Sequence, residues 1–141
     1  MGHYAKVLNN KVIQVLVADS DFMAGYIDTS PGTWLKTSYN TSGGKHYTVD
    51  SNGDQTYTIL SDRQDKAIRK NFAGIGFNYD PVKDAFYSDP PFDSWVLDSD
   101  TYCWKAPITN PHDPDKSYWH EGDKEFKLFT KPENWVDSGE Q

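Results

Sequence analysis

The sequence contains a single cysteine, Cys103, and this scarcity excludes two kinds of structure. One cysteine cannot form an intramolecular disulfide, and it cannot supply a cysteine-based zinc site. We therefore expect a protein suited to a reducing compartment. Cys103 lies between Tyr102 and Trp104, and its nearest positively charged neighbour is Lys105. This setting is more typical of a buried packing residue than of a nucleophile.

Positive charge is also scarce. The formal net charge is -7, and no cluster of Lys and Arg reverses it locally. Such a chain repels phosphate backbones, which disfavours nucleic-acid binding. No apolar run approaches the ~20 residues that span a bilayer, and the N-terminus has no signal-peptide pattern. We expect no membrane association and folding in a cytoplasm.

Aliphatic side chains are few and aromatic side chains are many. The hydrophobic fraction is 36% and the aromatic fraction is 15%. Aromatic and β-branched residues suit the pleated surface of a sheet. The composition therefore predicts a mainly β protein with several small apolar clusters in place of one large core.

Residues 1–76 read as an N-terminal β domain that begins with a hairpin. Asn9 and Asn10 separate two β-prone runs, and Asn tolerates the positive φ angles of a tight turn. The second run, residues 12–17, is almost continuously apolar. That pattern is typical of a strand covered on both faces, and we expect an antiparallel pair with a buried second arm.

One short helix and one excursion complete this domain. The helix should be capped by Asp19 or Ser20 and end near Gly25. Extended structure should then return around Trp34. Residues 42–66 form the excursion, a hairpin whose arms carry more Thr and Tyr than Val and Leu, so it should face solvent or a partner.

Residues 77–130 read as three successive aromatic hairpins. In each, a large apolar residue is followed by an acidic turn and, seven positions later, by an aromatic residue. A hairpin with a four-residue loop places two such residues opposite each other across the ladder, and cross-strand pairs of this kind stabilise a sheet. The three pairs are Tyr79 with Phe86, Leu97 with Trp104, and Trp119 with Phe126.

Two-stranded ribbons are poorly stable alone in water, so the hairpins must pack on the N-terminal sheet, on each other or on another molecule. We expect eight large side chains to serve this packing or an interface. Residues 131–141 should form a C-terminal tail. The eight packing or interface residues are Trp34, Tyr79, Phe86, Trp95, Leu97, Trp104, Trp119 and Phe126.

Acidic residues form two groups that merit a test for metal binding. Asp50, Asn52 and Asp54 have the alternate spacing of a calcium loop, but Ser61 stands where the bidentate Glu is expected. A plain turn is the better interpretation. Residues 112–123 contain His, Asp and Glu in a proline-broken loop with no helical i,i+4 pair, which favours a solvated acidic loop. We expect no metal, no cofactor and no catalytic set.

The aromatic residues also admit a carbohydrate-binding interpretation. Exposed Trp and Tyr rings stack on sugar faces, and neighbouring acids accept hydrogen bonds from hydroxyl groups. The seven-residue spacing, however, is explained by packing across a ladder and is not needed for sugar binding. Packing is therefore the favoured interpretation, with glycan binding as the alternative.

Two blocks of the sequence are distinctive: "RKNFAGIGFNYD" at 69–80 and "SWVLD…WKAP" between 94 and 107. Together with "HYAKVLNNKVIQVLVAD" and "YWHEGDKEF" they make the chain resemble a family of small proteins from tailed bacteriophages, particularly phages of cyanobacteria and other aquatic bacteria. The resemblance covers most of the chain, apart from residues 49–66 and those after Phe129. It implies a virion structural protein without enzymatic activity, and it carries over no catalytic residues.

We therefore expect a virion protein that is assembled in the host cytoplasm and is present in several copies per particle. Its partners would be other virion proteins, either the major capsid protein or tail components. The favoured role is capsid decoration, in which the protein cements neighbouring capsid subunits. The alternative is a tail- or fibre-associated protein that binds host surface glycan. A polysaccharide-cleaving virion enzyme is the least supported hypothesis.

Overall fold

The structure is a computed structural model, and it describes residues 2–129. The expected tail at 131–141, like residue 130, lies outside the described residues. Within them the protein is mainly β, with one short α-helix and two 3-10 turns. The strands form a five-stranded sheet, a three-stranded sheet and two separate two-stranded ribbons, all antiparallel. The predicted fold class is confirmed.

The N-terminal hairpin is the centre of the five-stranded sheet. Asn9 and Asn10, with φ values of 52° and 63°, form the turn between its first two strands. Both angles lie in the left-handed region that Asn tolerates, as the sequence predicted. The sheet has the order β3-β1-β2-β7-β8. Its strands are β1 (Gly2–Leu8), β2 (Lys11–Ala18), β3 (Thr33–Thr37), β7 (Asn78–Asp80) and β8 (Ala85–Tyr87).

The helix α1 (Ser20–Gly25) follows β2 directly. Asp19 is its N-cap residue, although the Asp19 side chain makes no capping hydrogen bond. The helix begins and ends where the sequence predicted. Tyr26 returns the chain to extended geometry, and the segment that follows leads to β3.

The hydrophobic core is small, and both halves of the chain contribute to it. Ala5, Val7 and Val12 come from β1 and β2, whereas Ala73 and Phe86 come from later segments. Phe86 is fully buried and is the largest side chain in the core. The hairpin β7–β8 therefore extends the N-terminal sheet and completes its core.

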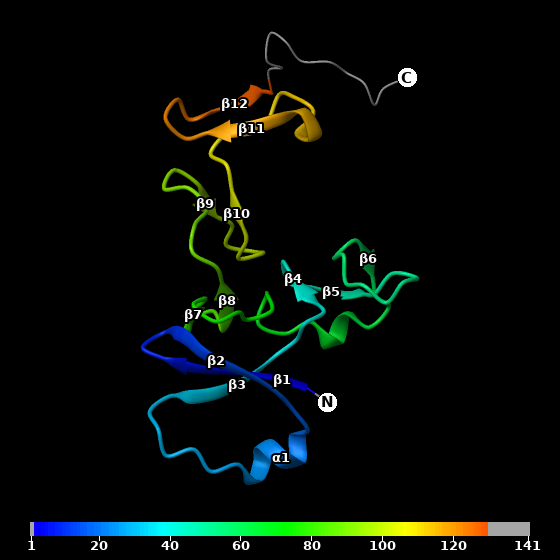
Figure 1. The fold of residues 1–141 in the computed structure, drawn as a ribbon, viewed down its shortest axis with the longest axis vertical. Helices are drawn as coiled ribbons and strands as arrows, with labels where there is room; N and C mark the ends of the chain where they lie inside the picture. Colours follow the sequence, from blue (N-terminus) through cyan, green and yellow to red (C-terminus); the bar gives the residue numbers. More distant parts are fainter. Residues whose placement is uncertain (1, 130–141) are drawn as a thin grey trace, which may run out of the picture.

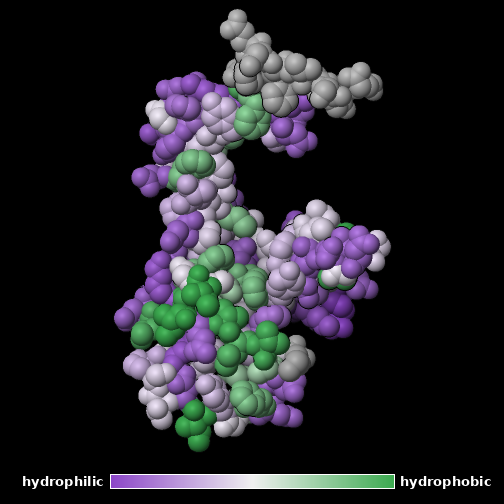
Figure 2. All heavy atoms as spheres, in the orientation of Figure 1, coloured by the Kyte–Doolittle hydropathy of each residue, from purple (hydrophilic) through white to green (hydrophobic). Residues whose placement is uncertain are grey.

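The expectation that β2 is covered on both faces is wrong. Ile13 is 44% exposed and Val17 is 56% exposed. The core covers one face near Val12, while β7 pairs with β2 only through Lys11 and Asn78. Figure 2 shows hydrophobic residues gathered at the surface over this part of the sheet.

The excursion forms a three-stranded sheet of its own. It contains β4 (Thr41–Ser42), β5 (Lys45–Thr48) and β6 (Ile59–Leu60), and a 3-10 turn, η1 (Gln64–Lys66), follows it. β6 begins only at Ile59, because Tyr57 has a positive φ of 54° and lies outside the strand. Ile59 and Leu60 are exposed.

Three hairpins follow one another after residue 77, and they are named here in chain order. Hairpin 1 is β7–β8, which belongs to the five-stranded sheet. Hairpin 2 pairs β9 (Val96–Leu97) with β10 (Trp104–Lys105), and hairpin 3 pairs β11 (Ser117–His120) with β12 (Glu125–Leu128) after the 3-10 turn η2 (Pro114–Lys116). Figure 1 shows them stacked as a column that rises from the N-terminal sheet.

The side chain of Asn71 hydrogen-bonds to several segments that meet at the base of this column. Its Oδ1 accepts a hydrogen bond of 2.9 Å from the Gly43 backbone N–H. Its Nδ2 lies 2.9 Å from the Phe86 carbonyl oxygen, 3.3 Å from that of Thr101 and 3.0 Å from that of Tyr102. One amide thus joins the excursion, hairpin 1 and the turn of hairpin 2.

We expect Asn71→Ala to destabilise the fold by about 2–3 kcal/mol, because several partly buried backbone groups lose their partner at once. Urea unfolding followed by tryptophan fluorescence measures this difference. Asn52→Ala, in the exposed turn of the excursion, is the matched control and should stay within about 0.5 kcal/mol of the wild type. Equal stability of the two variants would contradict the role assigned to Asn71.

Candidate functional site

The three predicted cross-strand pairs are present. Tyr79 is opposite Phe86, Leu97 is opposite Trp104, and Trp119 is opposite Phe126. The rings of the first pair are 5.2 Å apart and those of the third are 5.0 Å apart, between centroids. The seven-residue spacing therefore predicted the register of each hairpin. These side chains pack within the chain.

Hairpin 2 is joined to hairpin 1 by rings and by two hydrogen bonds. The Tyr102 ring packs edge-on against Tyr87 at 5.7 Å. The Tyr102 hydroxyl donates to the Asp80 carboxylate at 2.8 Å, and Trp104 Nε1 donates to the Ser88 carbonyl at 2.8 Å. The hydrogen bond from Tyr102 is the main reason that the pKa of Asp80 lies below its usual value.

Hairpin 3 is joined to hairpin 2 through two tryptophans and one carboxylate. Trp95 packs edge-on against Trp119 at 6.1 Å. Glu121 accepts hydrogen bonds from the Ser94 hydroxyl and from Trp119 Nε1. These bonds lower the pKa of Glu121, with the Ser94 bond contributing most. Trp119 is only 7% exposed, so it offers no open face for a sugar.

Sequence reasoning missed Glu121, because it placed this residue in a solvated acidic loop. The available signal was its position two residues after Trp119, which brings both side chains to one side of the turn. Asp50 does act as a turn residue, since its side chain accepts from the backbone N–H groups of Asn52 and Asp54. No three His, Cys, Asp or Glu side chains converge as a metal site within residues 2–129. Cys103 is half-buried beside Asn71.

Trp34 lies apart from the other seven predicted residues, in a partly buried charge network on the N-terminal sheet. Lys6 is only 3% exposed, and its Nζ pairs with the Asp28 carboxylate at 2.5 Å. Trp34 Nε1 donates to the same carboxylate at 3.0 Å, and Ser30 hydrogen-bonds to both charged groups. The pKa of Asp28 is held well below its usual range, chiefly by Lys6. Trp34 thus secures the segment between α1 and β3.

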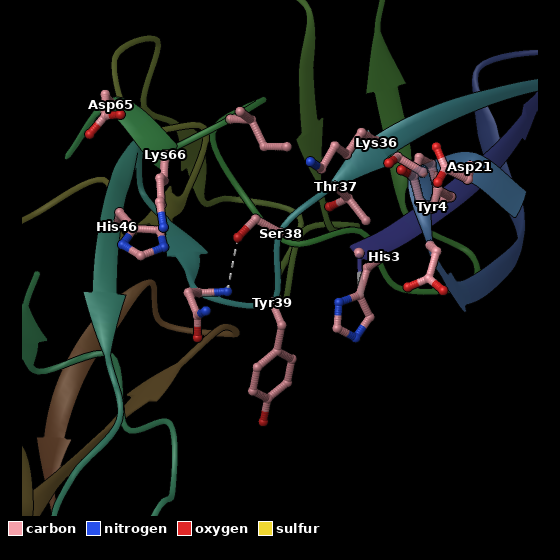
Figure 3. Close-up of a pocket in the computed structure, with 15 residues that line it drawn as sticks. His3, Tyr4, Asp21, Lys36, Thr37, Ser38, Tyr39, His46, Asp65 and Lys66 are labelled. Atoms are coloured by element: carbon pink, nitrogen blue, oxygen red, sulfur yellow. Dashed lines mark hydrogen bonds between the residues drawn. The ribbon is translucent and has the colours of Figure 1, made fainter. Parts of the chain in front are cut away.

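A groove of about 880 Å³, lined mostly by polar side chains, lies between the N-terminal sheet and the excursion (Figure 3). Tyr39 is 45% exposed, and its ring stacks on His3 with 6.0 Å between centroids and packs edge-on against Phe72 at 5.3 Å. Lys36 and Lys66 also line the groove and make no ion pair within the described part of the chain. His46, held by a hydrogen bond between its Nδ1 and Ser61, lies beside Lys66.

Sequence reasoning did not identify this groove. Its lining residues come from β1, α1, β3, β5, η1 and the loops beside them, span positions 2–68 and include the acidic side chains of Asp19, Asp21 and Asp65, so no local spacing marks it. An exposed aromatic ring between charged and amide side chains is suited to a polar ligand with one apolar face, such as a sugar.

Two further findings bear on function. Among the described residues, no helix has the length and hydropathy that crossing a bilayer requires. Comparison of the chain with protein-family models, with curated proteins and with solved structures gives no match.

The pairing of Asp28 with Lys6 predicts a defined pH dependence. The pKa of Asp28 is lower in the folded state than the value of about 3.9 expected when unfolded. Its contribution to stability is therefore present above about pH 4 and is lost as the pH falls below it. We expect Asp28→Asn to be less stable than the wild type at pH 7 and the gap to narrow toward pH 3.

Urea unfolding of both proteins at pH 7, 5, 4 and 3 measures this gap. Other carboxylates with lowered pKa values, such as Asp80, titrate in both proteins and cancel in the difference. Asp62→Asn, which removes an exposed carboxylate, should follow the wild type throughout. A gap between Asp28→Asn and the wild type that stays constant from pH 7 to pH 3 would rule out the ion pair as its source.

Proposed function

We propose that the protein is a structural component of a tailed-bacteriophage virion, and that it decorates the capsid by cementing neighbouring capsid subunits. The main support is the column of small hairpins, each held to the previous one by a few rings and hydrogen bonds. An extended column offers contact surface at several levels, which suits a protein that must touch more than one subunit.

Exposed apolar side chains occur along the whole column. Val96 is 49% exposed, Ile108 48%, and Leu128 51%. Contiguous exposed apolar patches mark sites of protein–protein contact, whereas single exposed apolar side chains are normal on protein surfaces. The aromatic rings named from the sequence are mostly used inside the chain, so these aliphatic side chains are the better candidates for the capsid contact. The sequence resemblance to phage virion proteins supports a structural role in the virion, which the capsid and tail hypotheses share.

Phage particles that lack the protein should lose infectivity at lower temperature and under osmotic shock, while still adsorbing to cells. The reason is that the lost contacts bridge capsid subunits and do not touch the host. Heat-inactivation and adsorption assays on mutant particles measure both properties. Adding purified protein to the mutant particles should restore their heat resistance. Unchanged particle stability would contradict the cement role.

The polar groove favours a second candidate function, in which the protein is part of the tail or a fibre and binds host surface glycan. Tyr39 supplies an exposed ring, and the lysines, His46 and Asn40 supply hydrogen-bonding groups around it. This arrangement combines the stacking face and the polar rim that sugar recognition uses. It places the sugar at the groove and not at Trp119.

If the second function holds, Tyr39→Ala should abolish binding on a glycan array, because the stacking face is removed. Tyr118→Ala is the matched control, since Tyr118 is 40% exposed but lies on hairpin 3, outside the groove. Circular dichroism checks that both variants fold, and Lys66→Ala tests the same groove without altering the Tyr39 ring packing. No binding by the wild type, or equal loss in the Tyr118 control, would exclude glycan recognition in the groove.

A further inference from the structure

One edge of the five-stranded sheet is open along most of β2. On its outer side, β2 pairs with β7 only at Lys11, and Val12 exchanges backbone hydrogen bonds with Gly76 and Phe77. From Ile13 to Ala18, no strand within residues 2–129 pairs with this side. The backbone N–H and C=O groups that point outward there are free to bind another strand.

The open edge carries none of the charges or prolines that protect many edge strands, and its only irregularity within the described residues is a register shift at Ile13, between the Lys6–Gln14 and Val7–Val12 pairs. Soluble proteins protect such edges with lysine, proline or inward-pointing charge. Residues 12–18 contain neither charge nor proline, and Ile13 and Val17 are exposed. Ile75, which is 71% exposed, precedes Gly76, whose backbone N–H donates to the Val12 carbonyl at the start of this edge. Figure 2 shows this apolar surface over β2.

The two ends of the strand carry opposite charges. Lys11 begins β2; its side chain is 48% exposed and forms an exposed ion pair with Asp89 at 3.2 Å, which the acidic end of a second copy would share or replace. Asp19 and Asp21 follow the other end, are exposed and make no ion pair in the described part of the chain. Antiparallel pairing with an identical strand brings the Lys11 end of each copy toward the acidic end of the other. Parallel pairing would place like charges together.

We propose that β2 pairs antiparallel with β2 of a second copy of this chain across a two-fold axis. The pairing is self-complementary, as an isologous contact requires, and it joins two five-stranded sheets into one continuous sheet. It covers Ile13 and Val17 of both copies. The proposal concerns the isolated protein and does not depend on the capsid or glycan role.

The mass of the protein in solution, measured by light scattering during size-exclusion chromatography, tests the dimer. The wild type should have about twice the mass of 16.1 kDa calculated for one chain. Val17→Lys places two lysines near the axis, and like charges in an interface are strongly unfavourable, so its dimer should dissociate at least about 100-fold more readily. Val82→Lys is the matched control: Val82 is 88% exposed in the turn of hairpin 1, and the variant should remain dimeric.

Charge reversal tests the antiparallel direction. Lys11→Glu and Asp19→Lys should each weaken the dimer, and the double variant should restore it, because the opposite charges then meet again with their places exchanged. Hydrogen exchange of wild-type protein provides a readout without substitutions: amides between residues 13 and 18 should become more protected as the concentration rises. A monomeric wild type, a Val17→Lys dimer as stable as the wild type, or no rescue by the double variant would each overturn the proposal. The proposal would also be overturned if the β2 amides became protected from hydrogen exchange only when capsid protein is added.

Discussion

Two antiparallel strands alone bury too little apolar surface to be stable in water. Hairpins 2 and 3 therefore need contacts outside their own strands. Each ribbon is stabilised by the one before it. Tyr102 and Trp104 bind hairpin 2 to hairpin 1, and Glu121 binds hairpin 3 to Ser94. Each joint combines ring contact with hydrogen bonds, and a hydrogen bond fixes direction as well as distance. The column therefore has a defined order and orientation although none of its parts has a large core.

Polar side chains set most of the long-range positions in this protein. Apolar burial is modest, because the largest fully buried side chains are Phe86, Val12, Thr37 and Thr41. The Asn71 amide and the Lys6–Asp28 pair each connect segments that are distant in sequence. A buried polar group that is satisfied at one geometry only is costly to displace. Such groups hold a protein with a small apolar core in a single arrangement. Many of its aliphatic side chains remain exposed at the surface.

The features that the sequence predicted are local ones. The Asn9–Asn10 turn, the bounds of α1 and the seven-residue register of the hairpins each depend on residues a few positions apart. Asn71, Glu121 and the polar groove depend on residues brought together by the fold, and no spacing reports them. The prediction that β2 is covered on both faces was wrong for a different reason. A strand buried on both faces and a strand with an exposed, unpaired edge have the same hydropathy pattern. Composition therefore gave the fold class and left the placement of the long-range contacts open.

The position of Phe86 in the core has a consequence for synthesis of the protein. Chains emerge from the ribosome N-terminus first, and β1 and β2 are made early. Their core is complete only after Phe86 has emerged, since it fills the space above Ala5 and Val12. Until then the nascent β1–β2 hairpin presents unfilled apolar surface, and the pairing of Lys11 with Asn78 closes a long loop. The N-terminal sheet can therefore reach its native structure only after the segment that contains Phe86 has been synthesised.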